Sequence, residues 1–486
     1  MTKKYYKYII AFAVFCVLVI LVLFWFIPNR QDAVIFAMIE KIDFSNTEEQ
    51  VVEKINRLLE ETKKESSSAD NWGKLGMSLF IHGYKDISIP VFKKAATIDD
   101  KDFRWSYFCA IALNDLNSSD AVNWFERSRK LNPDYPPLIV MLGNRYLIDG
   151  DLQKAEQAFS QVIESAVRVP HANLGLAKIL IKKGDLAAAQ IQVQKAIDMA
   201  PKYREAHAIF GDIYRRMGEI SSAEKEFQIM EQLPERLDLA DSIYYQMVDE
   251  GVSSFWYQVR AEKYLKLGQL DKAEEEFSKA LEAKPNVVSY ASLGNVYQKQ
   301  KRWDKALELY QQALQIDSNY SDALNNMGVV YFEKGNIDTA ILIVKRSLRI
   351  KPESLDGYLN LGTFYKHTGH RLKAIECFQR GRELAPDDLR FAYQLAWLMA
   401  VSPEAKLRNG KESQNLAEMI CDQTNYDATA LDLLSVALAE NGQYKKALDV
   451  SGRAYILAVF NKNYQLANDI KIRQKFYKSN QPYREK

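Results

Sequence analysis

The stretch from Ser254 to Pro386 repeats one pattern four times, and this repetition constrains the fold more than any other feature of the sequence. Equivalent positions of the four copies hold the large apolar residues Tyr257, Tyr290, Leu324 and Tyr358, so successive copies lie 33 to 34 residues apart. A fixed period of this length indicates stacked helical hairpins, in which each hairpin buries its apolar face only against its neighbours.

Each copy contains two amphipathic helices, because apolar residues recur at intervals of three and four positions. In the copy that begins at Ser321, Gly335 ends the first helix with a residue that tolerates positive φ. Pro352 ends the second helix, since it cannot continue the hydrogen-bond pattern. Small residues recur where two helices must approach closely: Gly294, Gly328 and Gly362 in the first helix, and Ala273, Ala306, Ala340 and Ala374 in the second.

The spacing of these residues closely resembles that of the tetratricopeptide repeat (TPR) family. The resemblance implies a right-handed α-solenoid, and degenerate copies on both sides extend it to about eleven hairpins. The predicted fold class is therefore all-α, a solenoid of TPR-like hairpins preceded by one transmembrane helix. The predicted organisation is a cytoplasmic N-terminus (1–7), a transmembrane signal anchor (8–27), a helical stalk (28–68), an N-terminal array (69–235), a spacer helix (236–253), a C-terminal array (254–460) and a capping tail (461–486).

Residues 8–27 form an uncharged apolar run of about the length that crosses a bilayer as a helix. Lys3, Lys4 and Lys7 precede it, so the positive-inside rule keeps the N-terminus in the cytoplasm. We therefore expect a single-pass protein of the bacterial inner membrane whose repeats lie in the periplasm. The alternative is a cleaved signal peptide, but the run is long for one and no small-residue cleavage site follows it.

The stalk carries two apolar stripes, which could pair with another helix or cap the solenoid. The first stripe comprises Ile35, Ile39 and Ile42, and the second Val52, Ile55, Leu58 and Leu59. Pairing through these stripes would allow a homodimer.

Composition and motifs argue against several functional classes. The net charge is +2, from 65 basic and 63 acidic residues, which predicts no binding of nucleic acid through bulk charge. Cys16, Cys109, Cys377 and Cys421 form no CxxC pair, although a bridge between the last two stays open. No phosphate-binding loop or catalytic motif is present. We therefore expect no enzyme activity, no cofactor and no metal site.

The candidate site is a row of amide side chains, because in TPR arrays certain positions of the first helix line the concave surface. The resemblance places five residues there: Asn295, Asn325, Asn326, Asn360 and Gln394. An amide both donates and accepts hydrogen bonds, so it can pair with the backbone of an extended peptide whatever that peptide's sequence. The alternative is that asparagine is simply common at these positions. Some relatives use a basic clamp for a C-terminal carboxylate, but its positions hold Ala291 and Asp356 here.

These observations predict a membrane-tethered scaffold that binds partner proteins or extended peptides on its concave face. The alternative is an accessory subunit of a cell-envelope assembly, polysaccharide-export or glycosyl-transfer machine. Ala396, Trp397, Tyr477 and the segment Pro482–Glu485 resemble the C-terminal segment of bacterial membrane-attached TPR proteins, some of which carry a glycosyltransferase domain. This chain has no such domain, so the resemblance brings no activity with it.

Overall fold

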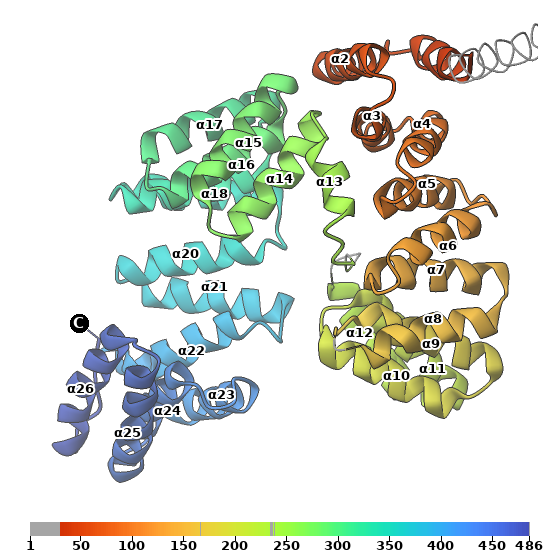
Figure 1. Cartoon of the computed structure of the whole chain (residues 1–486). Helices are drawn as coiled ribbons and strands as arrows, with labels where there is room; N and C mark the ends of the chain where they lie inside the picture. Colours follow the sequence, from red (N-terminus) through yellow and green to blue (C-terminus); the bar gives the residue numbers. More distant parts are fainter. Residues whose placement is uncertain (1–29, 166, 234–236, 238, 486) are drawn as a thin grey trace, which may run out of the picture. The chain divides into compact units, whose positions relative to one another are not determined.

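The computed structural model describes residues 30–165, 167–233, 237 and 239–485, and all regular structure within them is helical. The chain divides into two compact units, Met1–Tyr257 and Gln258–Lys486, so the division falls inside one helix, α14. Within each unit, consecutive helices form antiparallel hairpins that pack in chain order (Figure 1). We call the first helix of each hairpin the A helix and the second the B helix.

The described part of the first unit begins with a helix over residues 30–40. The helices that follow are α2 (Glu49–Lys64), α3 (Ala69–Ile81), α4 (Lys85–Ile98), α5 (Phe103–Asp115), α6 (Ala121–Leu131), α7 (Pro136–Asp149), α8 (Leu152–Glu164), α9 (Pro170–Lys183), α10 (Leu186–Met199), α11 (Arg204–Met217), α12 (Ile220–Gln232) and the short α13 (Tyr244–Asp249). The helices from α3 to α12 form five hairpins.

The second unit carries six hairpins, from α14 to α25, followed by one more helix. Its elements are α14 (Ser254–Lys266), α15 (Leu270–Ala283), α16 (Val287–Lys299), α17 (Trp303–Ile316), α18 (Ser321–Glu333), α19 (Ile337–Ile350), α20 (Leu355–His367), α21 (Arg371–Leu384), α22 (Leu389–Val401), the 3-10 turn η1 (Ala405–Leu407), α23 (Gly410–Gln423), α24 (Ala428–Glu440), α25 (Tyr444–Phe460) and α26 (Tyr464–Lys478).

The hairpins close because a small residue on the A helix faces a large one on the B helix. A Cβ atom added to Gly328 would lie 2.4 Å from the side chain of Val344, and one added to Gly362 would lie 2.4 Å from that of Phe378. At this distance something must shift, so the recurrent glycine allows the close approach of the two helices. Gly335 ends α18 with a φ of +82°, the conformation that glycine adopts without strain.

The stalk residues pack onto the first unit. Ile35 and Ile39 of the helix over 30–40, and Ile55 of α2, are buried in the same hydrophobic cluster as Trp72 of α3. Phe36 stacks on Trp72 with ring centroids 5.0 Å apart. The apolar stripes therefore have an intramolecular partner, which removes the reason for expecting a homodimer through them.

The structure contradicts the predicted localisation in the inner membrane. No helix among residues 30–165, 167–233 and 239–485 is both long and apolar enough to cross a bilayer. The reason is physical: the longest of the α-helices named above, α25, has 17 residues and a solvated face, whereas a span needs about 20 predominantly apolar ones. Residues 8–27, the predicted transmembrane anchor, lie outside the described residues, and the membrane assignment is not retained.

Candidate peptide-binding face

The A helices of the second unit lie next to one another, and this brings their side chains within reach across repeats. α16 contacts α18, and α18 contacts α20, in addition to the contacts that each makes with its own B helix. Side chains on the same face of successive A helices can therefore form a continuous row. Four of the five predicted site residues occupy such positions.

These four asparagines are hydrogen-bonded to one another across three helices. Asn360 of α20 donates from Nδ2 to Oδ1 of Asn325 on α18 at 3.1 Å. Asn325 donates to Oδ1 of its neighbour Asn326 at 3.4 Å. Asn326 in turn donates to Oδ1 of Asn295 on α16 at 2.7 Å. We call this chain of side chains the amide row.

A buried tyrosine fixes one end of the amide row. Tyr310 of α17 directs its hydroxyl at Oδ1 of Asn295 and at Oε1 of Gln298, each at 2.7 Å. Burial raises the pKa of Tyr310 well above its ordinary value, so the hydroxyl keeps its proton and acts as the donor. The oxygen of Asn295 therefore accepts from both Asn326 and Tyr310, which leaves its amide nitrogen for another partner.

The row keeps hydrogen-bonding capacity beyond these contacts. Asn325 is buried, but Asn295, Asn326 and Asn360 are half-exposed. Each amide can donate twice and accept twice, and the contacts above use only part of that capacity. The exposed edge of the row can thus donate to and accept from a ligand while the buried edge links the helices.

Gln394, the fifth predicted residue, does not join the row. It lies on α22, and its Oε1 accepts a hydrogen bond from Nζ of Lys366 on α20 at 2.9 Å. Burial lowers the pKa of Lys366, and the charge of Glu485 partly offsets this effect. The structure therefore places Gln394 in a separate polar pair near the C-terminal segment.

That C-terminal segment is a part of the face that the sequence did not reveal. The amide of Glu485 donates to the carbonyl of Val401 at 3.0 Å, and Arg484 donates to the carbonyl of Ala400 at 2.9 Å. Arg484 also forms an ion pair of 2.5 Å with Glu440 of α24. An extended stretch of the chain is thus held by the A helices α22 and α24. The sequence signal was the motif Pro482–Glu485, which resembles the C-terminal segment of other TPR proteins but does not indicate which helices it contacts.

Tyr483 anchors this segment among apolar and aromatic side chains. It packs against the buried Val401 and Val436, and its ring meets Phe476 edge-on at 5.6 Å. Beside it, Arg473 pairs with the buried Asp432 at 2.5 Å. The A-helix layer therefore holds this segment by one aromatic anchor, one ion pair and hydrogen bonds to the carbonyls of Ala400 and Val401.

The remaining candidates for chemistry are ordinary structural residues. Cys109, Cys377 and Cys421 are free and buried, so the bridge that the sequence left open is not formed. Burial raises the pKa of Cys109 to about 12 and those of the other two to about 11, which keeps all three as thiols. Among the described residues no group of His, Cys, Asp and Glu side chains is placed to hold a metal ion.

Comparison with known families identifies several of the repeats. One model described as a TPR repeat matches residues 294–335, and one described as a tetratricopeptide repeat matches residues 140–204. A third, also described as a tetratricopeptide repeat, matches residues 257–287, 321–354 and 355–388. A comparison with curated proteins found no match.

Several solved structures resemble parts of this chain. MamA (residues 41 to the end) from Desulfovibrio magneticus RS-1 is 21% identical, with a TM-score of 0.32, and the match covers 34% of this chain and 94% of that one. YrrB, described as a TPR protein with an unusual peptide-binding site, is 19% identical, with a TM-score of 0.24, and the match covers 49% of this chain and 96% of that one.

Proposed function

We propose that this chain, which belongs to the tetratricopeptide repeat family, is a scaffold that holds an extended segment of a partner protein against the A helices of its second unit. The observation that carries the proposal is the amide row, in which Asn295, Asn326 and Asn360 are half-exposed and keep donors and acceptors for a ligand. Backbone N–H and C=O groups of an extended segment have the matching capacity.

The C-terminal segment supports the proposal from within the same unit. There the A-helix layer already holds extended backbone, through the hydrogen bond from Glu485 to Val401 and the anchor Tyr483. A partner segment on the amide row would use the same kinds of contact, with amide side chains in place of helix-terminal carbonyls. Because backbone pairing is independent of sequence, specificity would have to come from contacts of the ligand's side chains beside the row.

We further propose that the chain acts by binding and not by catalysis. A catalytic site needs a nucleophile, acid or base with a matched partner in a shared site. Tyr107 and Tyr310, whose pKa values burial raises well above the ordinary value, serve as hydrogen-bond donors within the fold.

The test removes the exposed part of the row. In the full-length chain, Asn326→Ala combined with Asn360→Ala should reduce capture of the partner from a lysate of the native host at least tenfold, measured by crosslinking and mass spectrometry. The control is Asn319→Ala combined with Asn336→Ala, since both residues are exposed and lie in turns of the same repeats.

A second control separates lost binding from lost stability. Val344→Ala removes a buried side chain from the B helix of the same repeat but leaves the row intact. If this variant loses the partner as completely as the double asparagine variant does, or if the double variant keeps it, the amide row does not bind the partner.

A further inference from the structure

The first unit holds a segment of its own chain along its A helices. Residues 239–256, which we call the return segment, run back from α9 towards α2, opposite to the order of the repeats. Just before the segment, the carbonyl of Leu237 lies 3.0 Å from Nε2 of His171 on α9. At the end, the indole of Trp256 donates to the carbonyl of Ile81 on α3 at 3.0 Å.

Two tyrosines bind a carboxylate of the return segment. The hydroxyl of Tyr107 on α5 donates to Oδ2 of Asp241 at 2.5 Å, and that of Tyr135, just before α7, donates to Oδ1 at 2.6 Å. Asp241 is only 4% exposed. Burial and the neighbouring carboxylate raise the pKa of Tyr107 well above 10, so it remains a donor. Two hydroxyls that donate to the two oxygens of one carboxylate, the buried Tyr107 and the partly buried Tyr135, form charge-assisted hydrogen bonds that favour an anionic group at this place.

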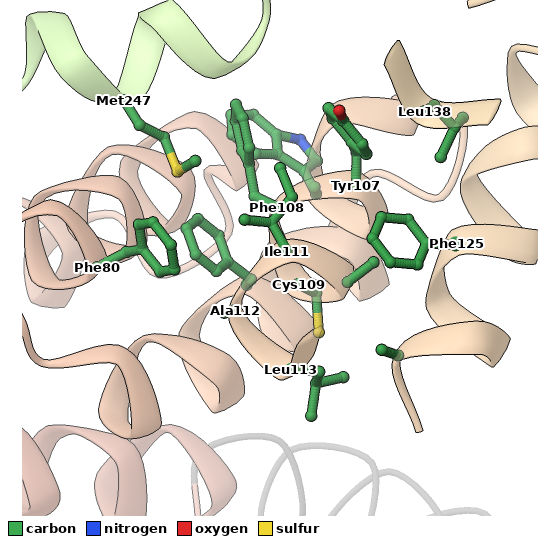
Figure 2. Packing of buried hydrophobic residues seen from close by; sticks show 14 of the residues in the cluster. Phe80, Tyr107, Phe108, Cys109, Ile111, Ala112, Leu113, Phe125, Leu138 and Met247 are labelled. Carbon is green, nitrogen blue, oxygen red and sulfur yellow. The ribbon is translucent and has the colours of Figure 1, made fainter. Parts of the chain in front are cut away.

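An apolar anchor follows on the short helix α13. Met247 is fully buried and Val248 nearly so, within the hydrophobic cluster of the first unit. Figure 2 shows Met247 pointing from α13 towards Phe80 and Phe108. An unbranched thioether fills such an irregular space between aromatic rings well.

A basic residue holds a second carboxylate. Nζ of Lys54 on α2 pairs with the carboxylate of Glu250 at 2.5 Å and donates to its carbonyl at 2.8 Å. Beyond this point the polarity reverses, because Val252 donates its amide proton to Nε2 of His82 at 3.1 Å. The helices that contact the return segment thus meet hydrogen-bond acceptors first, at Asp241 and Glu250, and then a donor, at Val252.

We propose that the A-helix layer of the first unit is a second peptide-binding site, which the return segment occupies in cis and which binds an acidic amphipathic segment of a partner protein in trans. The partner segment carries a carboxylate, an apolar residue six positions later and a second carboxylate three positions after that, as Asp241, Met247 and Glu250 do. This site lies in the first unit and is independent of the amide row.

The return segment is suited to exchange because few of its side chains are buried. Apart from Asp241, Met247, Val248 and Ser254, its side chains are half-buried or exposed, and its only complete helix spans six residues. Segments with few buried contacts open without unfolding of the whole domain. The tether, however, gives the cis segment a high effective concentration, so a free peptide binds the wild-type chain only weakly.

The test is binding of a labelled synthetic peptide with the sequence of residues 239–253, measured by fluorescence anisotropy. The full-length chain carrying Asp241→Ala and Met247→Ser should bind this peptide at least tenfold more tightly than the wild-type chain does. Adding Tyr107→Phe and Tyr135→Phe to the opened chain should abolish that gain. An opened, folded chain that fails to bind, or that binds a scrambled peptide equally well, overturns the proposal.

Hydrogen exchange of the wild-type chain tests the proposal independently of whether the opened variant folds. The return segment should exchange its protected amides at least tenfold faster than α5 and α7 do, because it opens on its own. Exchange of the return segment as slow as that of α5 would make it a permanent part of the core, and the proposal would then be wrong.

Discussion

Replacing Asn326 by Ala tests whether the amide row also links the repeats. The substitution removes the hydrogen bond to Asn295 and the acceptor of the one from Asn325. A hydrogen bond contributes about 0.5–1.5 kcal/mol net, and the 3.4 Å contact with Asn325 lies at the weak end. Because Asn325 is only 7% exposed, its amide then loses a partner in a poorly hydrated place, which adds to the cost. We expect a total loss of about 1–3 kcal/mol.

This loss falls on the interfaces between neighbouring repeats. In a solenoid, stability is close to a sum of repeat terms and nearest-neighbour terms, so weakening one interface promotes local opening there. Unfolding of a chain with two units need not be two-state, so a single melting temperature is a poor measure. Native-state hydrogen exchange resolves α16 and α18 separately and is the appropriate assay.

The expected result is faster exchange in α16 and α18, by about tenfold for each 1.4 kcal/mol lost. The helices α5 and α7 of the first unit should exchange at the wild-type rate, and Asn336→Ala, which alters an exposed turn residue, should change neither set. If Asn326→Ala leaves exchange in α16 and α18 unchanged, the row does not stabilise the repeats, and its contacts matter only for a ligand or not at all.

Two further predictions concern buried polar contacts. Protection of the return segment against hydrogen exchange should fall as the pH drops below 6.5. Burial lowers the pKa of His82, so the folded chain binds a proton on this ring less readily than the open chain does. Protonation also removes the ring nitrogen that accepts the hydrogen bond from the amide of Val252. Hydrogen exchange corrected for intrinsic rates measures this loss of protection, and His82→Gln should abolish its dependence on pH. The charged groups that act on the ring of His82 are Lys54, Glu48 and Glu250. Arg473→Met should cost about 3–5 kcal/mol, because it leaves the carboxylate of Asp432 buried without its partner. Exchange in α24 should accelerate accordingly, and adding Asp432→Asn should restore much of the protection, whereas no recovery would show that the ion pair is not the cause.

The hairpins were predictable because their determinants are local and repeated. The recurrent small residues, Gly328 among them, predicted a close approach of two helices, and the structure places Val344 within contact range of Gly328. The same argument holds for Gly362 and Phe378. Helix ends followed equally from single residues such as Gly335, whose positive φ is a property of that residue alone.

The candidate site was predictable only as a set of positions. The sequence put Asn295, Asn326 and Asn360 on the same face of successive A helices, but their mutual hydrogen bonds depend on the spacing of helices about 30 residues apart. The binding role of the row stays a prediction. The separation of Gln394 from the row depends on Lys366, a residue on another helix that no pattern singled out.

The return segment and the C-terminal segment could not be predicted, because each folds back onto helices far away in the sequence. Asp241 meets Tyr107 across 134 positions, and Arg484 meets the carbonyl of Ala400 across 84. Their signals were a spacer longer than an ordinary turn, and a polar tail that ends in the motif Pro482–Glu485. Such signals say that a segment is not a hairpin, but not where it goes.

The two units share one structural feature. A layer of A helices exposes donors, carbonyls and apolar edges that the hairpins themselves cannot cover, and in each unit a later stretch of the chain covers part of it. Each stretch uses one apolar or aromatic anchor, Met247 or Tyr483, and one ion pair across the layer. The pairs are Lys54 with Glu250 and Glu440 with Arg484. Under the two proposals made above, the chemistry that binds each stretch in cis is also the chemistry that a partner segment needs in order to bind in trans.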